Sequence, residues 1–200
     1  MTWVKVCGLR TAGDVESAEA AGADAIGLVL IEASPRHVDA VAAASLAAAA
    51  RLPAIVLTDT GRPEDVPELV ERIGAAGVQP YGPAAEAVAQ AAVDAGLMVL
   101  RPHQVVAPVA LGDFPAGQIP LLDGFSADAM GGTGVLVDRK LLPEGGTHFV
   151  LAGGLGPDNV AAAVQEVRPW GVDASSGLES SPGVKDPARI RAFVERAKDA

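Results

Sequence analysis

The sequence predicts an α/β fold, a compact (β/α)8 barrel formed by a single domain over residues 1–200. Apolar runs rich in Val, Ile and Leu recur along the chain, and most are followed by an Ala- and Glu-rich stretch, which is typical of strand–helix units. Half of the residues are hydrophobic and a fifth are charged, which suits parallel strands buried on both faces. Dividing 200 residues by eight leaves 25 per unit, enough for one lean core.

The elements follow one another in order along the chain. The eight predicted strands span residues 3–7, 25–30, 53–58, 77–80, 97–101, 119–123, 148–152 and 171–175. The clearest helices are predicted at 14–21, 39–50, 65–75, 84–95, 157–167 and 186–198. The Ala-rich stretch 40–50 is interpreted as an ordinary outer helix, because it lies between two strands. Helices five and six are expected to be shortened or replaced by loop.

A doubly wound open sheet also alternates strands and helices, and periodicity alone does not separate the two folds. The number of strands favours the barrel. An open sheet that binds a dinucleotide has a G-x-G-x-x-G turn after its first strand, whereas this chain has Cys7-Gly8-Leu9-Arg10 at that place.

Composition and charge exclude several partners. The formal net charge of −10 argues against nucleic acid, because phosphate backbones are bound by clustered Lys and Arg. A small anionic substrate held by backbone N–H groups is compatible with this negative net charge. Without a run of about 18 apolar residues or a signal peptide, we expect a cytoplasmic protein with no membrane contact. The single cysteine forms no internal disulfide. The three histidines, His37, His103 and His148, lack the spacing of metal ligands, so no metal site is expected.

Functional groups of a barrel gather at the carboxyl ends of its strands and in the loops that follow. This rule selects Cys7, Arg36, Asp59, Arg101, Asp123 and the loops 153–156 and 175–178. The fork of N–H donors on Arg36 suits a carboxylate or a phosphate, although a solvated surface arginine is the usual alternative.

Cys7 and Asp123 suit acid–base chemistry. Cys7 ends the first strand on the same side as Lys5, whose ammonium group favours a thiolate. Asp123 ends an apolar strand, where a buried carboxylate needs a partner or a task. Each residue also has an ordinary interpretation. A lone cysteine is often a small buried hydrophobic residue, and an aspartate before Gly124 suits a turn or a helix N-cap.

Two loops carry a phosphate signal. Gly153-Gly154-Leu155-Gly156 follows the seventh strand, and Ser175-Ser176-Gly177-Leu178 follows the eighth. Small residues let backbone N–H groups approach an anion, and barrels often hold phosphate at these loops. The residues at 156–159 also describe a helix start. Gly131-Gly132-Thr133-Gly134 suits either a loop that closes over substrate or a simple turn.

Several segments along the chain form a recognisable set. They are Val4-Lys5-Val6-Cys7-Gly8-Leu9, Gly22-Ala23-Asp24-Ala25-Ile26-Gly27, Ser34-Pro35-Arg36, Gly131-Gly132-Thr133-Gly134, Leu151-Ala152-Gly153-Gly154-Leu155 and Gly171-Val172-Asp173. Together with the highly specific stretch 175–186, they resemble the phosphoribosylanthranilate isomerase family of tryptophan biosynthesis over nearly the whole chain. The fold that this resemblance implies is again the (β/α)8, or TIM, barrel.

The resemblance implies an Amadori rearrangement that needs no cofactor, in which N-(5-phosphoribosyl)anthranilate becomes 1-(2-carboxyphenylamino)-1-deoxyribulose 5-phosphate. It implies that Cys7 is the general base and Asp123 the general acid. The substrate contacts that it implies are Arg36 with the anthranilate carboxylate, Gly154, Ser176 and Gly177 with the phosphate, and Asp173 with the sugar hydroxyls or in ordering the site. The expected partner is a small phosphorylated substrate. Monomer and homodimer both stay open.

The chain departs from the family pattern in the middle of the barrel. Val78-Gln79-Pro80-Tyr81-Gly82 stands where Val-Gln-Leu-His-Gly is usual, Leu57-Thr58-Asp59 replaces a Phe-Val-Asn-like end, and Val135 and Arg139 replace a lysine and an aromatic residue. Two alternatives follow: an isomerase with shifted or broadened specificity, as in histidine biosynthesis, and a phosphosugar-binding barrel without catalysis. The histidine-pathway family resembles a longer barrel with an aspartate in place of Cys7. A mere binder needs neither Cys7 nor Asp123.

Overall fold

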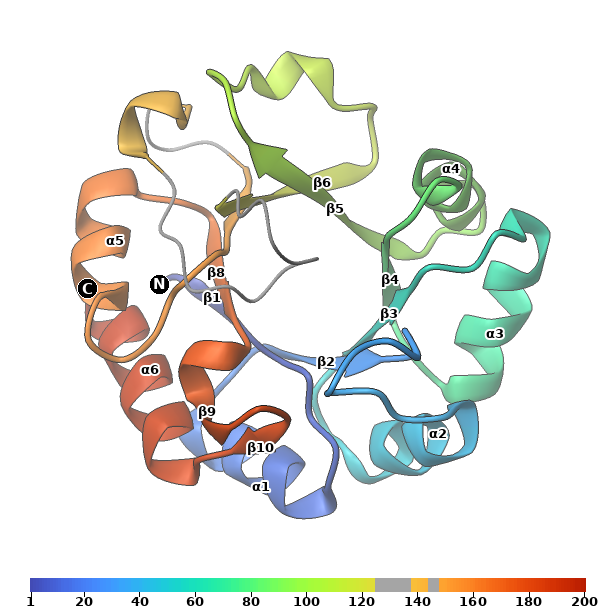
Figure 1. Ribbon diagram of the computed structural model, residues 1–200, viewed down its shortest axis with the longest axis horizontal. Helices are drawn as coiled ribbons and strands as arrows, with labels where there is room; N and C mark the ends of the chain where they lie inside the picture. The colour runs from blue at the N-terminus through green and yellow to red at the C-terminus, as the bar shows by residue number, and fades with distance from the viewer. Residues whose placement is uncertain (125–137, 144–147) are drawn as a thin grey trace.

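The structure is a computed structural model that describes residues 1–124, 138–143 and 148–200. Its centre is a closed barrel of parallel strands in chain order, which β1 completes by pairing with β8 (Figure 1). The strands are β1 (Trp3–Cys7), β2 (Ala25–Val29), β3 (Ala54–Thr58), β4 (Gly77–Pro80), β5 (Met98–Val105), β6 (Gln118–Gly124), β7 (Val150–Leu151) and β8 (Gly171–Ala174). Closure of the ring confirms the predicted barrel and excludes the open sheet.

Helices surround the barrel on its outer side (Figure 1). They are α1 (Ala12–Ala21), α2 (Ala40–Ala49), α3 (Val66–Ile73), α4 (Ala85–Asp94), α5 (Val160–Val167) and α6 (Pro187–Asp199). Short 3-10 turns add η1 (Pro63–Asp65), η2 (Leu111–Asp113), η3 (Arg139–Leu141) and η4 (Ser176–Leu178). As predicted, β5 is followed only by η2, and the described residues between β6 and β7 hold only η3. None of the described helices combines the length and apolarity needed to cross a membrane.

Capping residues explain where the helices begin and end. The Thr11 hydroxyl accepts from the Asp14 N–H at 3.1 Å and the Asp14 carboxylate accepts from the Thr11 N–H at 3.1 Å, which is a capping box for α1. Asp186, directly before Pro187, caps α6 because its carboxylate accepts from the Ala188 and Arg189 N–H groups. Gly22 closes α1 in the left-handed conformation, with φ of 82°. These local signals are present in the sequence, so the predicted helices agree well with those observed.

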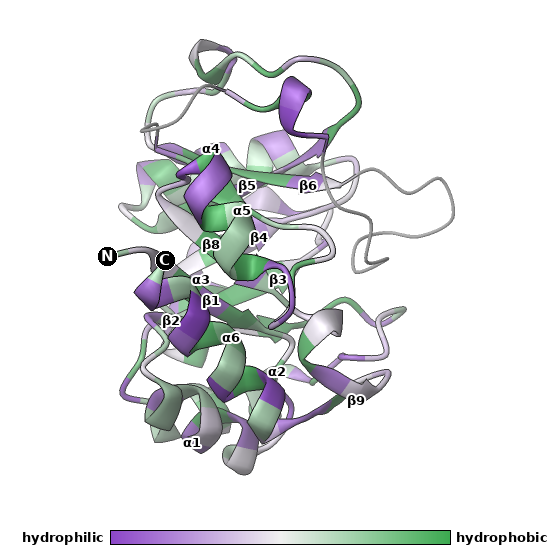
Figure 2. Cartoon of the chain, turned by 90° about the vertical axis from the view of Figure 1, so that its left-hand side faces the viewer, coloured by the Kyte–Doolittle hydropathy of each residue, from purple (hydrophilic) through white to green (hydrophobic). Residues whose placement is uncertain are grey.

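Alternation along the strands decides which side chains reach the interior of the barrel. In β1, Val4 and Val6 pack outward in a cluster that includes Phe193 of α6. Lys5 and Cys7 therefore point inward. In Figure 2 the apolar colour follows strands β1 and β3, whereas the surrounding helices show apolar and polar residues together.

A small apolar cluster fills the interior below the carboxyl ends of the strands. Its buried members are Ala25, Ile55, Leu100, Leu121, Val150 and Ala152. Trp3 and Trp170 pack against it and stack on each other, with ring centroids 4.9 Å apart. Leu121 and Ala152 also line the pocket described below, so this cluster forms the floor of the pocket.

Two strands differ in length from the predictions, and one hairpin was not predicted. β5 runs to Val105, beyond the predicted 97–101, because it pairs with β6 at every position from Val99 onward. β7 is limited to Val150–Leu151, within the predicted 148–152. A two-stranded antiparallel hairpin, β9 (Glu179–Ser181) and β10 (Val184–Lys185), follows β8. It was not predicted, because such short polar strands show no apolar alternation.

Candidate active site

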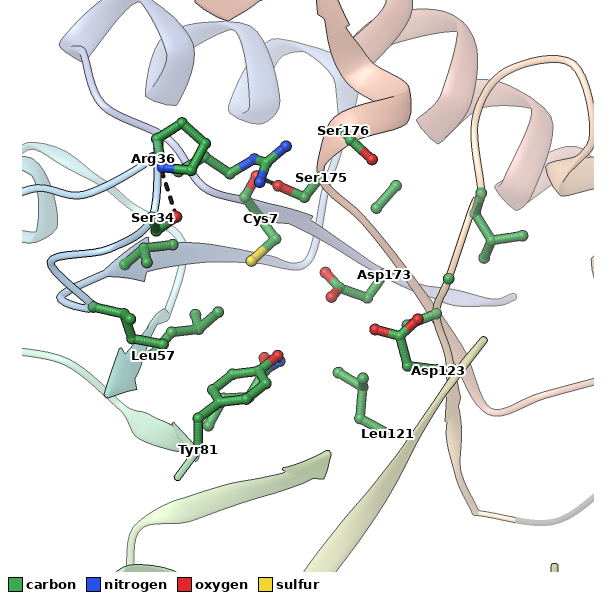
Figure 3. A pocket seen from close by; sticks show the side chains of 18 of the residues that line it. Cys7, Ser34, Arg36, Leu57, Tyr81, Leu121, Asp123, Asp173, Ser175 and Ser176 are labelled. Carbon is green, nitrogen blue, oxygen red and sulfur yellow. Dashed lines mark hydrogen bonds between the residues drawn. The ribbon is translucent and has the colours of Figure 1, made fainter. Parts of the chain in front are cut away.

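A pocket of about 520 Å³ opens at the carboxyl ends of the strands, where the strand-end rule placed the functional groups. Figure 3 shows the side chains of Cys7, Asp123 and Asp173 directed into it from β1, β6 and β8. The predicted residues that line it are Cys7, Arg36, Asp59, Asp123, Gly153, Gly154, Leu155, Asp173, Ser175 and Ser176. Arg101 lies elsewhere, because its guanidinium binds Glu86 of α4 at 3.1 Å.

Cys7 lies at the end of β1 with 4% of its surface exposed. A Cβ atom at Gly27 of β2 would stand 2.6 Å from Cys7 Sγ, so the thiol occupies space that only glycine leaves open. Burial raises the pKa of this thiol, and the opposing effect of Lys5 is smaller. Lys5 thus favours the thiolate as expected, but the net shift of the pKa is upward.

Lys5 lies below Cys7 and is fully buried. Its Nζ atom donates to Asp173 Oδ1 at 2.7 Å, between residues that face each other in the β1–β8 register. Burial lowers the pKa of Lys5, but Asp173 and Cys7 together outweigh burial and raise the pKa above its usual value. Asp173 is therefore held by Lys5 at the base of the pocket, which fits the predicted role of ordering the site.

Asp123 lies in β6 and faces the pocket, which favours the functional interpretation over a surface turn. Burial and the Asp173 carboxylate raise its pKa to about 6, although the Gly124 N–H and the Lys5 ammonium oppose that shift. Gly153 lies against it with φ of 83°, and a Cβ there would stand 2.5 Å from Asp123 Oδ1. The carboxyl group thus has restricted space and a strengthened hold on its proton.

Arg36 is held by a carboxylate that was not predicted from the sequence. Its Nε and Nη2 atoms donate to Glu179 Oε1 and Oε2 at 2.7 and 2.9 Å. Glu179 also accepts from Lys185 Nζ at 2.8 Å and from the Gly183 N–H at 3.2 Å. Lys185 Nζ donates further to the Ser175 carbonyl at 2.9 Å. The β9–β10 hairpin thereby fixes an arginine at the edge of the pocket.

Glu179 and Lys185 are buried charges, and their titration reflects their pairing. Burial alone raises the pKa of Glu179, but hydrogen bonds from Arg36 and Lys185 bring it below its usual value. Burial lowers the pKa of Lys185, against the effect of Glu179. The available signal in the sequence was a Glu and a Lys on either side of Gly183, in the segment with the most specific resemblance.

The loops after β7 and β8 differ in what they offer to an anion. Asn159 braces the first loop, because its Oδ1 accepts from the Gly156 N–H and its Nδ2 donates to the Gly154 carbonyl, both at 2.9 Å. Within the described ranges, the Gly154 and Ser176 N–H groups have no backbone acceptor. Gly177 is not among the described residues that line the pocket. A Cβ there would stand 2.1 Å from Leu155 O, so this glycine lets the two loops approach.

Tyr81, which replaces the usual histidine, lines the pocket on the side of β3 and β4. It packs in an apolar cluster with Cys7, Val29 and Leu57. Its hydroxyl oxygen accepts a hydrogen bond from Gln79 Nε2 at 2.7 Å. The altered strand thus supplies an aromatic ring and a polar pair to one wall of the site.

Of the remaining departures, Leu57 and Asp59 line the pocket, whereas Thr58, Pro80 and Arg139 are not among the described residues that do. Thr58 is buried and its hydroxyl accepts from the Thr60 N–H at 3.2 Å, while Pro80 ends β4 beside it. The segment 131–134 and Val135 lie outside the described residues. Within residues 1–124, 138–143 and 148–200, no three His, Cys, Asp or Glu side chains gather as a metal ion requires.

Comparisons with known proteins agree with this geometry. Residues 4–196 match the family model described as N-(5'phosphoribosyl)anthranilate (PRA) isomerase. The chain is 41% identical to the N-(5'-phosphoribosyl)anthranilate isomerase of Leptothrix cholodnii, over 100% of this chain and 92% of that protein. It is also similar to the crystal structure of phosphoribosyl anthranilate isomerase from Thermus thermophilus, with a TM-score of 0.84, 29% identity and 99% of both chains covered.

A further solved structure is of phosphoribosyl anthranilate isomerase in complex with reduced 1-(o-carboxyphenylamino)-1-deoxyribulose 5-phosphate. It has a TM-score of 0.77 and 26% identity to this chain, and the match covers 100% of both chains. Sequence, fold and the placement of Cys7 and Asp123 in one pocket thus lead to one family. The chain belongs to the N-(5'-phosphoribosyl)anthranilate isomerase family.

Proposed function

We propose that this protein converts N-(5-phosphoribosyl)anthranilate into 1-(2-carboxyphenylamino)-1-deoxyribulose 5-phosphate in tryptophan biosynthesis, with Asp123 as general acid and Cys7 as general base. The observation that carries the assignment of these roles is that both side chains face one pocket, where the pKa of Asp123 is raised to about 6. A proton donor and a proton acceptor that work as a pair need different pKa values, and Asp123 and Cys7 meet this requirement.

The first step uses the protonated form of Asp123. The carboxylic acid donates its proton to the ribose ring oxygen, the bond from that oxygen to C1 breaks, and the nitrogen electron pair forms a C1=N bond. The product is an open-chain protonated Schiff base. Burial and the nearby Asp173 carboxylate raise the pKa of Asp123, so a fraction of Asp123 stays protonated near neutral pH.

The second step uses the Cys7 thiolate. It removes the proton from C2, and the released electron pair forms a C1=C2 bond while the nitrogen becomes neutral. The resulting enol tautomerises to the ketone as C1 gains one proton and the enol hydroxyl loses one. Transfer of the proton from the Cys7 thiol to the Asp123 carboxylate through solvent restores both groups. Burial raises the pKa of Cys7, so the ionised thiolate is a strong base. The positive Schiff base beside it favours that ionised form, as Lys5 does.

The rest of the pocket suits the two ends of the substrate. Arg36 offers a positive charge, fixed in place by Glu179, for the anthranilate carboxylate. The N–H groups of Gly154 and Ser176 are proposed to bind the phosphate, because both residues line the pocket and neither N–H has a backbone acceptor within the described ranges. Gly177 lets its loop approach Leu155 closely, and Asp173 orders the site through Lys5. A cavity of about 520 Å³ is of the size that holds such a ligand.

Other features of the proposal concern the whole protein. A small phosphorylated substrate is compatible with the net charge of −10, because the anionic groups are met locally by Arg36 and by backbone N–H groups. A cytoplasmic location and a single domain over residues 1–200 stay predictions.

The test compares two substrates with one protein preparation. Freshly generated phosphoribosylanthranilate is mixed with the enzyme and the loss of its fluorescence is followed. The corresponding aminoaldose of histidine biosynthesis is assayed in parallel. We expect turnover of the anthranilate substrate. Faster turnover of the histidine-pathway substrate supports the related isomerase instead, and binding of the reduced product without any turnover supports the non-catalytic barrel.

A further inference from the structure

We propose that Gln79 and Tyr81 together bind one hydroxyl group of the opened ribose chain and make the enzyme selective for a hydroxylated linker between anthranilate and phosphate. The inference deepens the proposed isomerase function and rests on it. It concerns the part of the pocket lining formed by Gln79 of β4 and by Tyr81 directly after it, here called the β4 wall. The acid–base mechanism described above does not use these two residues.

Gln79 carries an unsatisfied acceptor beside the pocket. Its side chain lines the cavity, and the residue is only 1% exposed. Nε2 donates to the Tyr81 hydroxyl at 2.7 Å, whereas Oε1 has no hydrogen-bond partner among the residues that the structure describes. A buried carbonyl oxygen without a donor is costly, and a substrate group that donates to it relieves that cost.

Tyr81 completes the arrangement with a donor. Its oxygen already accepts from Gln79 Nε2, so its own O–H bond is free to rotate toward a ligand acceptor. The ring is anchored beside Cys7 and Leu57, and Figure 3 shows it reaching into the pocket between Leu57 and Leu121. Packing therefore sets the position of the hydroxyl oxygen before substrate binds, while its proton can turn toward a ligand.

One acceptor next to one donor matches a hydroxyl group, which donates one hydrogen bond and accepts another. A carboxylate or a phosphate only accepts and would meet the oxygen of Gln79 with an unfavourable contact. The proposed partners of those substrate groups are elsewhere in the pocket: Arg36 for the carboxylate, and the loops bearing Gly154 and Ser176 for the phosphate. In the closed ring β4 lies opposite β8, across the pocket from the loop that bears Ser176 (Figure 1). Figure 3 shows the Tyr81 ring pointing toward the part of the pocket that Cys7 and Asp123 also face, where the reacting sugar chain is proposed to lie.

The experiment measures binding of two probes by calorimetry. The first is reduced 1-(2-carboxyphenylamino)-1-deoxyribulose 5-phosphate, which carries the hydroxyl groups. The second is N-(2-carboxyphenyl)-5-aminopentyl phosphate, which keeps the carboxylate, ring and phosphate but has no hydroxyl group. The quantity of interest is the ratio of the two Kd values, because it cancels any effect that a variant has on both probes.

Three variants give the comparison. Gln79→Met and Tyr81→Phe each remove one member of the pair with little change of shape. Gln118→Met is the matched control, because Gln118 of β6 is also buried with both amide atoms lacking partners among the described residues, yet it is not among the described residues that line the pocket.

We expect the wild type and Gln118→Met to prefer the hydroxylated probe by roughly 10-fold or more, and Gln79→Met and Tyr81→Phe to lose most of that preference. Gln79→Met is expected to have a thermal midpoint no lower than the wild type, since the substitution removes an unsatisfied buried acceptor. A Gln79→Met protein that melts earlier and keeps the full preference assigns Gln79 a structural role and overturns the proposal.

Equal weakening of both probes also overturns it, because Gln79 then binds the shared aniline nitrogen or ring. Failure of this inference is separate from failure of the proposed function. An enzyme that turns over phosphoribosylanthranilate but binds both probes equally is an isomerase without a hydroxyl-selective β4 wall. An enzyme with no turnover removes the proposed function itself.

Discussion

Glu179 accepts two hydrogen bonds from the guanidinium of Arg36, at 2.7 and 2.9 Å, although 143 positions separate the two residues in the chain. The same carboxylate accepts from Lys185 at 2.8 Å. The hairpin that follows β8 therefore fixes the orientation of Arg36 before any substrate binds. In a bidentate pair of this kind, geometry as well as charge is specified.

Glu179→Gln is expected to affect both binding and stability. Arg36 loses one charged partner and its fixed orientation, so KM for phosphoribosylanthranilate should rise by roughly 10-fold while kcat changes less. Lys185 is left buried opposite a neutral amide, which should cost about 3 kcal/mol of unfolding free energy. Steady-state kinetics and urea unfolding measure the two effects.

Glu86→Gln is the matched control for that variant. Glu86 also binds an arginine, Arg101 at 3.1 Å, but its side chain is 62% exposed. We expect neither KM nor stability to change measurably. If Glu179→Gln is as mild as Glu86→Gln, the hairpin does not position Arg36.

The pH dependence of kcat/KM follows from the order of the two pKa values. Burial raises the pKa of Cys7, while that of Asp123 is about 6. Above pH 6 the fraction of Cys7 thiolate increases with pH by the same factor by which the fraction of protonated Asp123 decreases. We therefore expect kcat/KM to rise up to about pH 6 and then to stay level. In Asp123→Asn the residual rate should continue to rise above pH 6. A wild-type rate that falls steadily between pH 6 and 8 contradicts this order.

Asp123 should also make stability depend on pH. Its folded pKa of about 6 lies above the ordinary value of 3.8, so the folded state binds the proton more tightly. That contribution to stability is fully present below about pH 4 and is lost as the pH rises through 6, with a total of up to about 3 kcal/mol. Compared with Asp123→Asn, the wild type should therefore lose stability between pH 4 and 7 in urea unfolding.

Asp199→Asn serves as the control, because Asp199 is exposed at the carboxyl end of α6. Its stability should follow that of the wild type at every pH. A constant difference between wild type and Asp123→Asn across the range is the result that refutes the raised pKa.

Two glycines near the predicted phosphate loops should respond differently to alanine. A Cβ at Gly177 meets Leu155 O at 2.1 Å, whereas a Cβ at Gly156 has its nearest neighbour at 3.4 Å. Gly177→Ala should therefore push the two loops apart, at a cost of about 1–3 kcal/mol, and weaken binding of inorganic phosphate. Gly156→Ala should bind as the wild type does. Equal phosphate titrations for both variants speak against the close approach of the loops.

The barrel was predictable because buried parallel strands are short apolar runs, and the helices because caps such as Thr11 and Asp186 are local signals. Cys7 and Asp123 could be selected because a closed barrel brings all strand ends to one side. The resemblance to a family then assigned them separate roles.

Other parts of the site could not be predicted because they depend on the path of loops or on the sum of opposing effects. The pairing of Arg36 with Glu179 needs a hairpin whose strands are too short and polar to be recognised. Gly177 lies in a segment with the composition of an anion-binding loop, but the sequence does not show that its backbone lies close to Leu155 of the preceding loop. The pKa of Cys7 depends on the balance of burial against Lys5, which sequence spacing does not contain.

The central claim is that Asp123 and Cys7 perform the two proton transfers in one pocket. Its most direct test is the rate at which phosphoribosylanthranilate fluorescence is lost with wild type, Cys7→Ser and Asp123→Asn, all shown to bind the reduced product. We expect rapid loss with the wild type and rates lower by roughly 10²–10⁴-fold in each variant. Near-wild-type turnover in either variant, with binding intact, contradicts the role assigned to that residue.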